Sequence, residues 1–328
     1  MDLNSSTDII ESNQSELRAD NSALIARICW SYFKEGQTQD AIAQRLKITR
    51  KRVNRILAEA RESGFVQITI ADPAGQRTAL EAGLIAKFDL QDAIVVPAPL
   101  DALDIRVFVG AAAAHYIGTC LPPSGSLGIA WGGTINAAAQ NLPRRSGENT
   151  RVVLLCGGLA ESAPINPYDN AAMIARALGA RCYYLTAPMF AETEELRDIL
   201  VASEPVRSVL AMVPSLDVAL LSAIDLTEQS KALEYNVIPR ETWHSLRAAG
   251  AVGDICGHYL DAKGTPLLHP LTRRTINPSL EQIFQVKHRV LAAGGLHKVA
   301  IIRAGLLAHL CHVLVTDENA ASRLLDSD

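Results

Sequence analysis

The residues between positions 45 and 61 carry a strong local concentration of positive charge. Seven Lys or Arg residues and one acid, Glu59, fall in this stretch, whereas the whole 328-residue chain has a formal net charge of −4. Arg50, Lys51 and Arg52 crowd the start of a predicted helix, where the helix dipole disfavours cations. A purely structural helix would begin with Asp or Glu, so the pattern favours contact with a polyanion over a solvated helix face.

The same stretch has the apolar spacing of two short helices joined by a tight turn. On both sides of the turn, apolar residues recur at the spacing of a helix. They are Ala41, Ile42, Leu46, Val53, Ile56 and Leu57. Thr38 and Thr49 are expected to cap the two helices, because a threonine hydroxyl accepts a hydrogen bond from a free backbone N–H. Lys47 occupies the turn, where positive φ favours glycine.

Such a helix pair places its second helix in the major groove of DNA, where cations reach phosphates and base edges. The predicted DNA-binding residues are Thr38, Gln39, Lys47, Thr49, Arg50, Lys51, Arg52, Asn54 and Arg55. Apolar residues at helical spacing over 22–34 would complete a three-helix core, and the alternation of Phe65–Ile70 predicts the strand of a wing.

A second set of residues that could bind a ligand lies in the C-terminal two thirds of the chain. Three glycine pairs, Gly132-Gly133, Gly157-Gly158 and Gly294-Gly295, follow predicted strands or neighbour basic residues. Glycine lets backbone N–H groups approach an anion closely, although a single pair is more often only a turn. Thr134 adds a hydroxyl and Lys298 adds a positive charge, and both suit a phosphate. Neither a GxGxxG fingerprint nor a Walker loop is present, so the sequence does not indicate nucleotide binding.

Three polar residues of the same region are candidates for binding sugar hydroxyls. A carboxylate can accept two hydrogen bonds from a diol, and an amide can both donate and accept. The candidates are Asn170, Asp217 and Asp254. For each of the two acids, a surface or capping role is an equally good interpretation.

These residues are positioned by a predicted alternation of strands and helices from about residue 93. Strands are predicted at 93–97, 126–131, 151–155, 181–185, 209–213, 218–223, 299–303 and 313–315, and helices at 104–116, 135–142 and 170–178. Short β-branched runs separated by helices predict an α/β fold with a largely parallel, Rossmann-like sheet. Ligands of such sheets bind at the carboxyl ends of the strands.

The composition is that of an ordinary globular protein, 48% hydrophobic and 20% charged. No signal-like segment and no apolar run of about 18 residues occurs, so a cytoplasmic location without a membrane partner is expected. The six cysteines form no CxxC pair, which argues against a disulfide or zinc framework. No metal or other cofactor is predicted.

The expected organisation has four parts. They are a polar, disordered tail (1–20), a winged helix-turn-helix domain (21–71), a linker and dimerisation helix (72–92) and an effector domain (93–328).

With these segments in place, the chain resembles the SorC family of bacterial sugar-responsive transcriptional regulators. The resemblance extends from about residue 23 to 325, and its blocks occur in the family's order and spacing. The most specific blocks are the helix pair at 32–70, LGIAWGGTI, LLCGGLA, AVGDICGHYLDAKG, AAGGLHKVAIIRAGL and VLVTDENAASRLL.

The resemblance implies an effector domain similar to sugar-phosphate isomerases and deaminases, and a homotetramer built as a dimer of dimers. It also implies a site formed by Gly132, Gly133, Thr134, Gly157, Gly158, Leu159, Asp217, Asp254, Gly294, Gly295 and Lys298. The expected partners are double-stranded operator DNA and a sugar, polyol or sugar phosphate. Two positions depart from the family pattern: Lys47, and Gly133, where other members often carry a larger polar residue.

The sequence therefore predicts a regulator of a carbohydrate or polyol catabolic operon, with repression preferred over activation. The alternative is a sugar-phosphate isomerase or deaminase fused to a DNA-binding domain. Such an enzyme needs a positioned base and acid. Asp217, Asp254, His258 and His297 are available, but they form no compact motif in the sequence.

Overall fold

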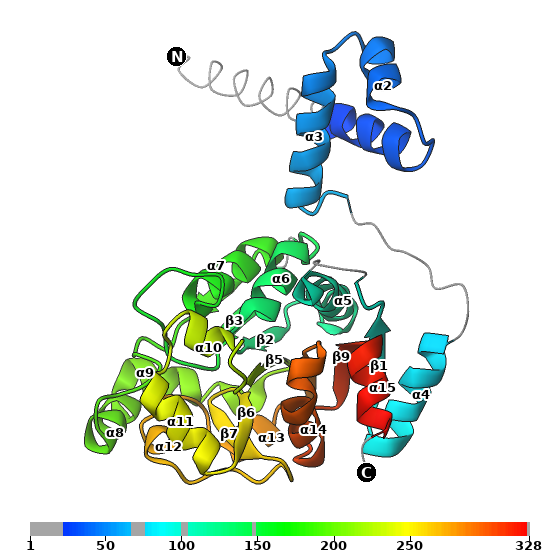
Figure 1. The fold of residues 1–328 in the computed structure, drawn as a ribbon. Coiled ribbons are helices and arrows are strands. Elements are labelled where there is room, and N and C mark those ends of the chain that lie inside the picture. Colours follow the sequence, from blue (N-terminus) through cyan, green and yellow to red (C-terminus); the bar gives the residue numbers. More distant parts are fainter. Residues whose placement is uncertain (1–21, 67–75, 100–103, 146–148, 327–328) are drawn as a thin grey trace, which may run out of the picture. The chain divides into compact units, whose positions relative to one another are not determined.

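The computed structural model describes residues 22–66, 76–99, 104–145 and 149–326. It divides into two units at residues 70 and 71, and each unit is described by itself (Figure 1). The predicted tail, 1–20, and residues 67–70 of the predicted wing lie outside the described residues.

The N-terminal unit is a cluster of three helices. A helix over 22–33 precedes α2 (Gln39–Leu46) and α3 (Arg50–Glu62). Ile28, Ile42 and Val53 are fully buried and form the centre of a small core. The three-helix core expected from apolar spacing is therefore confirmed.

The ends of α2 and α3 are capped as their sequences predict. The Thr38 hydroxyl accepts a hydrogen bond from the backbone N–H of Ala41, and that of Thr49 accepts from Arg52 N–H, both at 3.2 Å. Lys47 ends α2 with φ of 52°, in the left-handed region. The turn therefore needs the conformation that glycine adopts most easily, and a lysine adopts it here.

The C-terminal unit is built on a parallel sheet with the strand order β1-β9-β8-β5-β2-β3-β4. The seven parallel strands are β1 (Asp92–Val96), β2 (Ser126–Ile129), β3 (Arg151–Leu154), β4 (Arg181–Tyr183), β5 (Val218–Asp225), β8 (His288–Ala292) and β9 (Val313–Asp317). An antiparallel hairpin, β6 (Ala251–Ile255) and β7 (His258–Asp261), extends from the end of β5.

Helices cover both faces of this sheet (Figure 1). One layer contains α5 (Ile105–Cys120), α6 (Gly133–Asn141) and α7 (Pro167–Leu178). The opposite layer contains α4 (Gln76–Phe88), α9 (Glu204–Leu210), α13 (Leu280–Phe284), α14 (Val299–Leu307) and α15 (Glu318–Asp326). The remaining short elements are α8 (Glu194–Ala202), η1 (Val213–Ser215), α10 (Lys231–Glu234), α11 (Arg240–Ala248), α12 (Pro270–Arg273) and η2 (Leu296–Lys298).

Alternation along each strand supplies both layers of the core. In β5, Val218 and Leu220 pack against the α5–α7 layer, whereas Ala219 and Leu221 pack against the α14 layer. A central strand buried on both faces reads as a continuous apolar run, and all eight residues of β5 are buried. The predicted α/β architecture with a parallel sheet is confirmed.

Two predicted strands are wrong. Residues 209–213 form the end of α9 and the start of η1, and residues 299–303 form the first half of α14. Both runs are short and apolar, and periodicity alone cannot separate a buried strand from a buried helix of that length. The sequence reading also missed β8 and the β6–β7 hairpin.

The predicted linker helix belongs to the sheet-containing unit. Leu84 and Phe88 of α4 are buried in the core, and the Glu81 carboxylate accepts a hydrogen bond from Val95 N–H in β1 at 2.9 Å. Gly83 packs against Leu325 of α15. These apolar residues of the predicted linker helix thus pack within the same chain, and its role in dimerisation stays a prediction. Among the described residues, no helix has the length and apolar character needed to cross a membrane.

A close contact between α5 and α6 gives a test of this packing. A Cβ atom on Gly110 would lie 2.5 Å from Ala137 Cβ and 2.8 Å from its backbone. Because backbone cannot move aside as a side-chain tip can, Gly110→Ala is expected to lower the free energy of unfolding by about 1–3 kcal/mol. Urea unfolding of the full chain measures this. His115→Ala, an exposed change on the same helix, should have almost no effect.

Candidate functional site

The outer face of α3 is exposed and cationic. Lys51, Arg52 and Asn54 are exposed and line one surface hollow together with Thr49 and Arg55. This face is available for contact with a polyanion. Among the remaining predicted DNA-binding residues, Thr38 and Lys47 are exposed and Gln39 is half-buried.

Two of the predicted cations make exposed ion pairs. Arg50 lies 3.5 Å from Asp40, and Arg55 lies 3.6 Å from Glu59. Exposed pairs of this kind contribute about 1 kcal/mol or less, so a phosphate can displace the carboxylates at little cost.

The strand order of the sheet has its topological switch point between β2 and β5, the place where open parallel sheets form a crevice. From β2 the chain moves outward through β3 to β4, and from β5 it moves the other way through β8 to β9. The loops after β2 and β5 therefore diverge to opposite sides. In open parallel sheets, ligands bind at this switch point, outside the carboxyl ends of the strands.

The Gly132-Gly133 pair lies at this crevice and starts α6. The first N–H groups of any helix lack an intrahelical acceptor. At the start of α6, Gly132 has φ of 122° and no side chain that could supply one. A Cβ on Gly132 would lie 3.0 Å from the Ser222 hydroxyl of β5. Thr134 follows in the first turn and is buried. This loop has the geometry expected of an anion-binding helix start.

The Gly157-Gly158 pair has a different role from the one predicted. The N–H of Gly157 donates to Ile276 O at 3.1 Å, and that of Gly158 donates to Ala187 O at 2.9 Å. A Cβ on Gly158 would lie 2.0 Å from the ring of Tyr168. These glycines permit close packing, and their N–H groups are not free for an anion. The carbonyl of Leu159 likewise accepts a hydrogen bond from Asn166.

The Gly294-Gly295 pair is bound to the end of β9. The N–H of Gly295 donates to an Asp317 oxygen at 2.6 Å, and the other oxygen of Asp317 accepts from Asn319 and Ala320, each at 3.1 Å. Gly295 has φ of 94°, which lets the chain turn directly into η2. This turn places Lys298 beneath the crevice.

Lys298 is buried, and its Nζ donates to the carbonyl of Ala223 in β5 at 2.8 Å. An ammonium group has three donors, and within the described part of the chain no carboxylate lies within 4.0 Å of this one. Burial lowers the pKa of Lys298, and Asp225 opposes that shift. A buried cation without a directly bonded carboxylate is a strong attractor for an anion.

The buried carboxylate of Asp254 joins the loop after β2 to the turn of the β6–β7 hairpin. One of its oxygens accepts from Trp131 Nε1 at 3.1 Å, and the other accepts from Gly257 N–H at 2.5 Å. Burial raises the pKa of Asp254 to about 7. Both oxygens are used in holding the strand end and the hairpin turn, so Asp254 acts as a structural acid here.

The placement of Asp217 corrects one predicted site residue. Asp217 immediately precedes β5, and its carboxylate accepts from Ser126 N–H at 2.9 Å and from Lys287 Nζ at 2.7 Å. Ser126 begins β2, so Asp217 lies at the amino ends of the strands. The sequence showed that Asp217 lies next to a predicted strand. Whether it lies at the amino or the carboxyl end of that strand follows from the direction of the strand in the sheet.

Asn170 is fully buried between α6 and α7. Its side-chain oxygen accepts from Asn136 at 2.9 Å, and its nitrogen donates to Pro164 O at 3.2 Å. It therefore links the two helices behind the Gly132 loop.

Several functional candidates were missed by sequence reasoning. Arg106 in the first turn of α5 lies over Gly133, because a Cβ there would be 2.7 Å from a guanidinium nitrogen. Asp225 ends β5, and its carboxylate lies 4.0 Å from His297 Nε2. Cations in the first turn of a predicted helix were the signal used for α3, and the same signal would have identified Arg106 in the first turn of α5.

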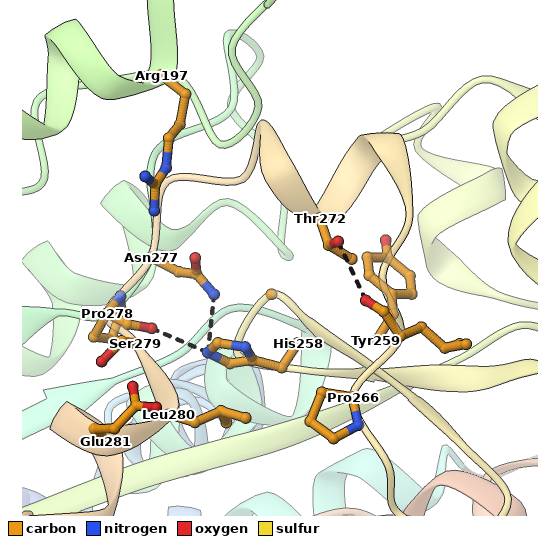
Figure 2. Close-up of a pocket in the computed structure, with 12 residues that line it drawn as sticks. Arg197, His258, Tyr259, Pro266, Thr272, Asn277, Pro278, Ser279, Leu280 and Glu281 are labelled. Carbon is orange, nitrogen blue, oxygen red and sulfur yellow. Dashed lines mark hydrogen bonds between the residues drawn. The ribbon is translucent and has the colours of Figure 1, made fainter. Parts of the chain in front are cut away.

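A separate cavity of about 260 Å³ lies beside the β6–β7 hairpin, α12 and α13 (Figure 2). Its wall includes His258, whose Nε2 lies 3.0 Å from Pro278 O and 3.1 Å from the Asn277 amide nitrogen. Burial lowers the pKa of His258. None of the predicted effector-binding residues lines this cavity, so the crevice between β2 and β5 is the stronger candidate.

Comparison with known proteins identifies the family of this chain. Residues 72–326 match the model of the family described as "Putative sugar-binding domain" (Sugar-bind). The chain is 32% identical to the erythritol catabolism regulatory protein EryD of Brucella abortus, over 94% of this chain and 97% of that one. The chain belongs to the SorC family of sugar-binding transcriptional regulators.

Other SorC-family proteins cover the same length. Identity to the deoxyribonucleoside regulator of Bacillus subtilis is 28%, over 90% of this chain and 95% of that one. The crystal structure of the full-length sorbitol operon regulator SorC from Klebsiella pneumoniae superposes with a TM-score of 0.73 at 25% identity, covering 93% and 98% of the two chains. This SorC-family chain is thus a sugar-responsive transcriptional regulator.

The raised pKa of Asp254 predicts how stability depends on pH. Because the folded-state pKa, about 7, exceeds the ordinary value of 3.8, the folded protein holds a proton that the unfolded chain loses. This contribution to stability is complete below about pH 4 and is lost as the pH rises through 7. Urea unfolding between pH 5 and 8 should show Asp254→Asn reducing the fall in stability with pH, which is at most about 1.4 kcal/mol per unit for one proton.

Asp261 in the same hairpin is the control. Hydrogen bonds from the N–H groups of Thr265 and Lys263 lower its pKa, so Asp261→Asn should leave the slope above pH 5 unchanged. An unchanged slope in Asp254→Asn would show that this carboxyl is already ionised at pH 5.

Proposed function

We propose that α3 is the recognition helix of a winged helix-turn-helix and that a sugar phosphate bound between β2 and β5 controls its engagement of operator DNA. The proposal rests on the observation that one chain contains two sites whose charges and hydrogen-bond donors suit an anion. One is the exposed cationic face of α3, and the other combines buried Lys298 at the end of β5 with the start of α6, which no side chain caps.

The DNA interface is supported by the arrangement of cations on α3. Lys51 and Arg52 are exposed and make no ion pair among the described residues, and Asn54 is exposed beside them. Arg50 and Arg55 exchange their exposed carboxylate partners for phosphates. Asn54 is placed to read adenine, because its amide can donate and accept at one base edge.

The effector is a phosphorylated sugar or polyol. Arg106 lies against Gly133 at the start of α6, and its charge acts on Lys298, whose Nζ bonds to the end of β5. All of these groups donate hydrogen bonds. A sugar hydroxyl could accept one such bond, but only a phosphoryl group supplies several acceptor oxygens and a compensating charge. Asp225 and His297 at the rim bind the hydroxyl groups of the sugar.

Regulation follows from differential affinity. A ligand shifts the balance between two arrangements only by the difference between its affinities for them. The chain is a repressor of a carbohydrate or polyol catabolic operon, and it acts as a homotetramer built from two dimers. Effector binding favours the arrangement that releases DNA. The names of EryD, an erythritol catabolism regulatory protein, and of SorC, a sorbitol operon regulator, support the assignment to a polyol catabolic operon.

A catalytic alternative has less support. The pair of Asp225 and His297 at 4.0 Å is the strongest acid–base candidate in the crevice. Asp254 is committed to Trp131 and Gly257, and Asp217 lies at the opposite edge of the strands. We expect no turnover when the protein is incubated with sugar phosphates, and steady product formation would favour an isomerase or deaminase.

The cations of α3 should determine the salt dependence of DNA binding. The double change Lys51→Ala and Arg52→Ala removes two phosphate contacts, so the slope of log K against log salt should fall in magnitude by about 2. Fluorescence anisotropy with operator DNA, or with any duplex for the non-specific component, measures this slope. Arg61→Ala is the matched control, because Arg61 lies on the same helix but 5.2 Å from the ring of Phe33. Equal slopes in all three proteins would contradict the assignment of α3.

Lys298 should determine the response to a phosphorylated effector. Lys298→Met removes a charged donor and should weaken sugar-phosphate binding about 10–100-fold while DNA affinity is retained. Calorimetry against a panel of sugars and their phosphates, with anisotropy on DNA, measures both properties. Lys287→Met is the control, since Lys287 pairs with Asp217 at the opposite edge. A normal response in Lys298→Met would exclude this lysine as the phosphate ligand.

A further inference from the structure

Arg106 occupies the space that a side chain on residue 133 would fill. A Cβ on Gly133 would lie 2.7 Å from a terminal guanidinium nitrogen of Arg106 and 3.1 Å from its Cδ. The backbone of α6 begins at this glycine, so the guanidinium of α5 lies directly across the start of α6. Because it has no side chain, Gly133 admits an arginine from a neighbouring helix.

Asp104 holds Arg106 in this position through its carboxylate. Arg106 Nε donates to the two oxygens of Asp104 at 2.8 and 2.7 Å, and the other terminal nitrogen also donates to it. The nitrogen nearest Gly133 has no hydrogen-bond acceptor among the described residues. The two side chains are 27% and 39% exposed, so water screens the pair and it can be opened at low cost.

The charges around Arg106 are mixed, since Asp104 pairs with it and Glu234 pairs with Lys231. Burial lowers the pKa of Lys298, and the positive charges of Arg106 and Lys231 lower it further, so these cations repel Lys298. Asp225 and Asp104 partly offset them. An anion placed between Arg106 and Lys298 would remove this repulsion, and Arg106 could then leave Asp104.

We propose that Arg106 determines specificity for a phosphorylated effector by exchanging the Asp104 carboxylate for the phosphoryl group, with Gly133 leaving the room that this exchange needs. The inference rests on the proposed phosphate site. It adds that Asp104 competes with the ligand, so the Asp104–Arg106 pair sets the affinity. A planar guanidinium can bind two phosphoryl oxygens at once, whereas Lys298 contributes a point charge.

This competition predicts effects of opposite sign from two adjacent residues. Asp104→Asn keeps a side chain that can cap α5, since Asp104 accepts from Arg106 N–H at 3.0 Å and Asn caps equally well. It removes the competing charge, so phosphate affinity should rise about 2–5-fold. Arg106→Gln should lower that affinity about 10–100-fold. A residue with a purely structural role would not give a gain in one variant and a loss in the other.

Gly133→Ala tests the space that the exchange requires. Its Cβ meets the flexible end of Arg106 and no backbone atom among its nearest neighbours, so the fold should tolerate it. The change should weaken phosphate binding in the wild-type background but have little further effect beside Arg106→Gln. Such non-additivity in a double-mutant cycle reports direct coupling of the two positions.

Calorimetric titration of the full chain with inorganic phosphate, ribose 5-phosphate and ribose provides the measurement. Arg181→Gln, an exposed arginine at the start of β4, is the control and should bind all three like wild type. We expect Arg106→Gln to lose the preference for ribose 5-phosphate over ribose and Arg106→Lys to recover only part of it. Circular dichroism and DNA affinity should stay unchanged in each variant.

The possible outcomes distinguish a wrong role for Arg106 from a wrong phosphate site. If Lys298→Met abolishes phosphate binding while Arg106→Gln and Asp104→Asn bind like wild type, the phosphate site stands and the role of Arg106 is wrong. If the wild-type chain shows no preference for ribose 5-phosphate or inorganic phosphate over ribose, both are wrong. Additive effects of Gly133→Ala and Arg106→Gln would overturn the spatial argument alone.

Discussion

A buried ammonium group at a crevice between diverging strands is the constraint on which the effector unit depends. Lys298 is removed from water and bonds to one carbonyl of β5. A buried charge is costly unless other groups compensate it. Around this charge the fold gathers the start of α6, the end of β5 and the turn after β8. In the proposed function, an anion supplies the compensating charge that Lys298 lacks.

The sheet supplies this arrangement through topology and not through local sequence. The three glycine pairs look equivalent in the sequence, yet they differ in function. Gly132-Gly133 begins a helix at the crevice, Gly157-Gly158 makes room for Tyr168, and Gly295 is bonded to Asp317. The difference arises because β2 and β5 are adjacent, whereas β3 lies one strand further out. A single glycine-rich pattern therefore begins a helix at the switch point in one loop and permits close packing in another.

The two units differ in whether their charged side chains are exposed or buried. The N-terminal unit buries a small core and exposes its cations, which water solvates well. The C-terminal unit buries charges and must pair or orient each of them, as Asp317, Asp254 and Lys298 illustrate. Exposed charges can exchange one partner for another easily, which suits DNA binding that must be reversible. Buried charges respond strongly to a single ligand, which suits a sensor.

The sequence by itself determined the helices, caps and cationic face of the N-terminal unit, as well as the α/β class of the remainder. These features depend on residues close together in the chain, so Thr38, Thr49 and the apolar spacing of 41–57 are sufficient to predict them. Lys298 was singled out in the sequence as a lysine close to a glycine pair, and its role in binding stays a prediction. Only the tertiary structure decided that Asp217 lies at the amino edge, that 299–303 is helical and that Arg106 covers Gly133. Each of these depends on strand direction or on contacts between residues far apart in the chain, which a local pattern does not contain.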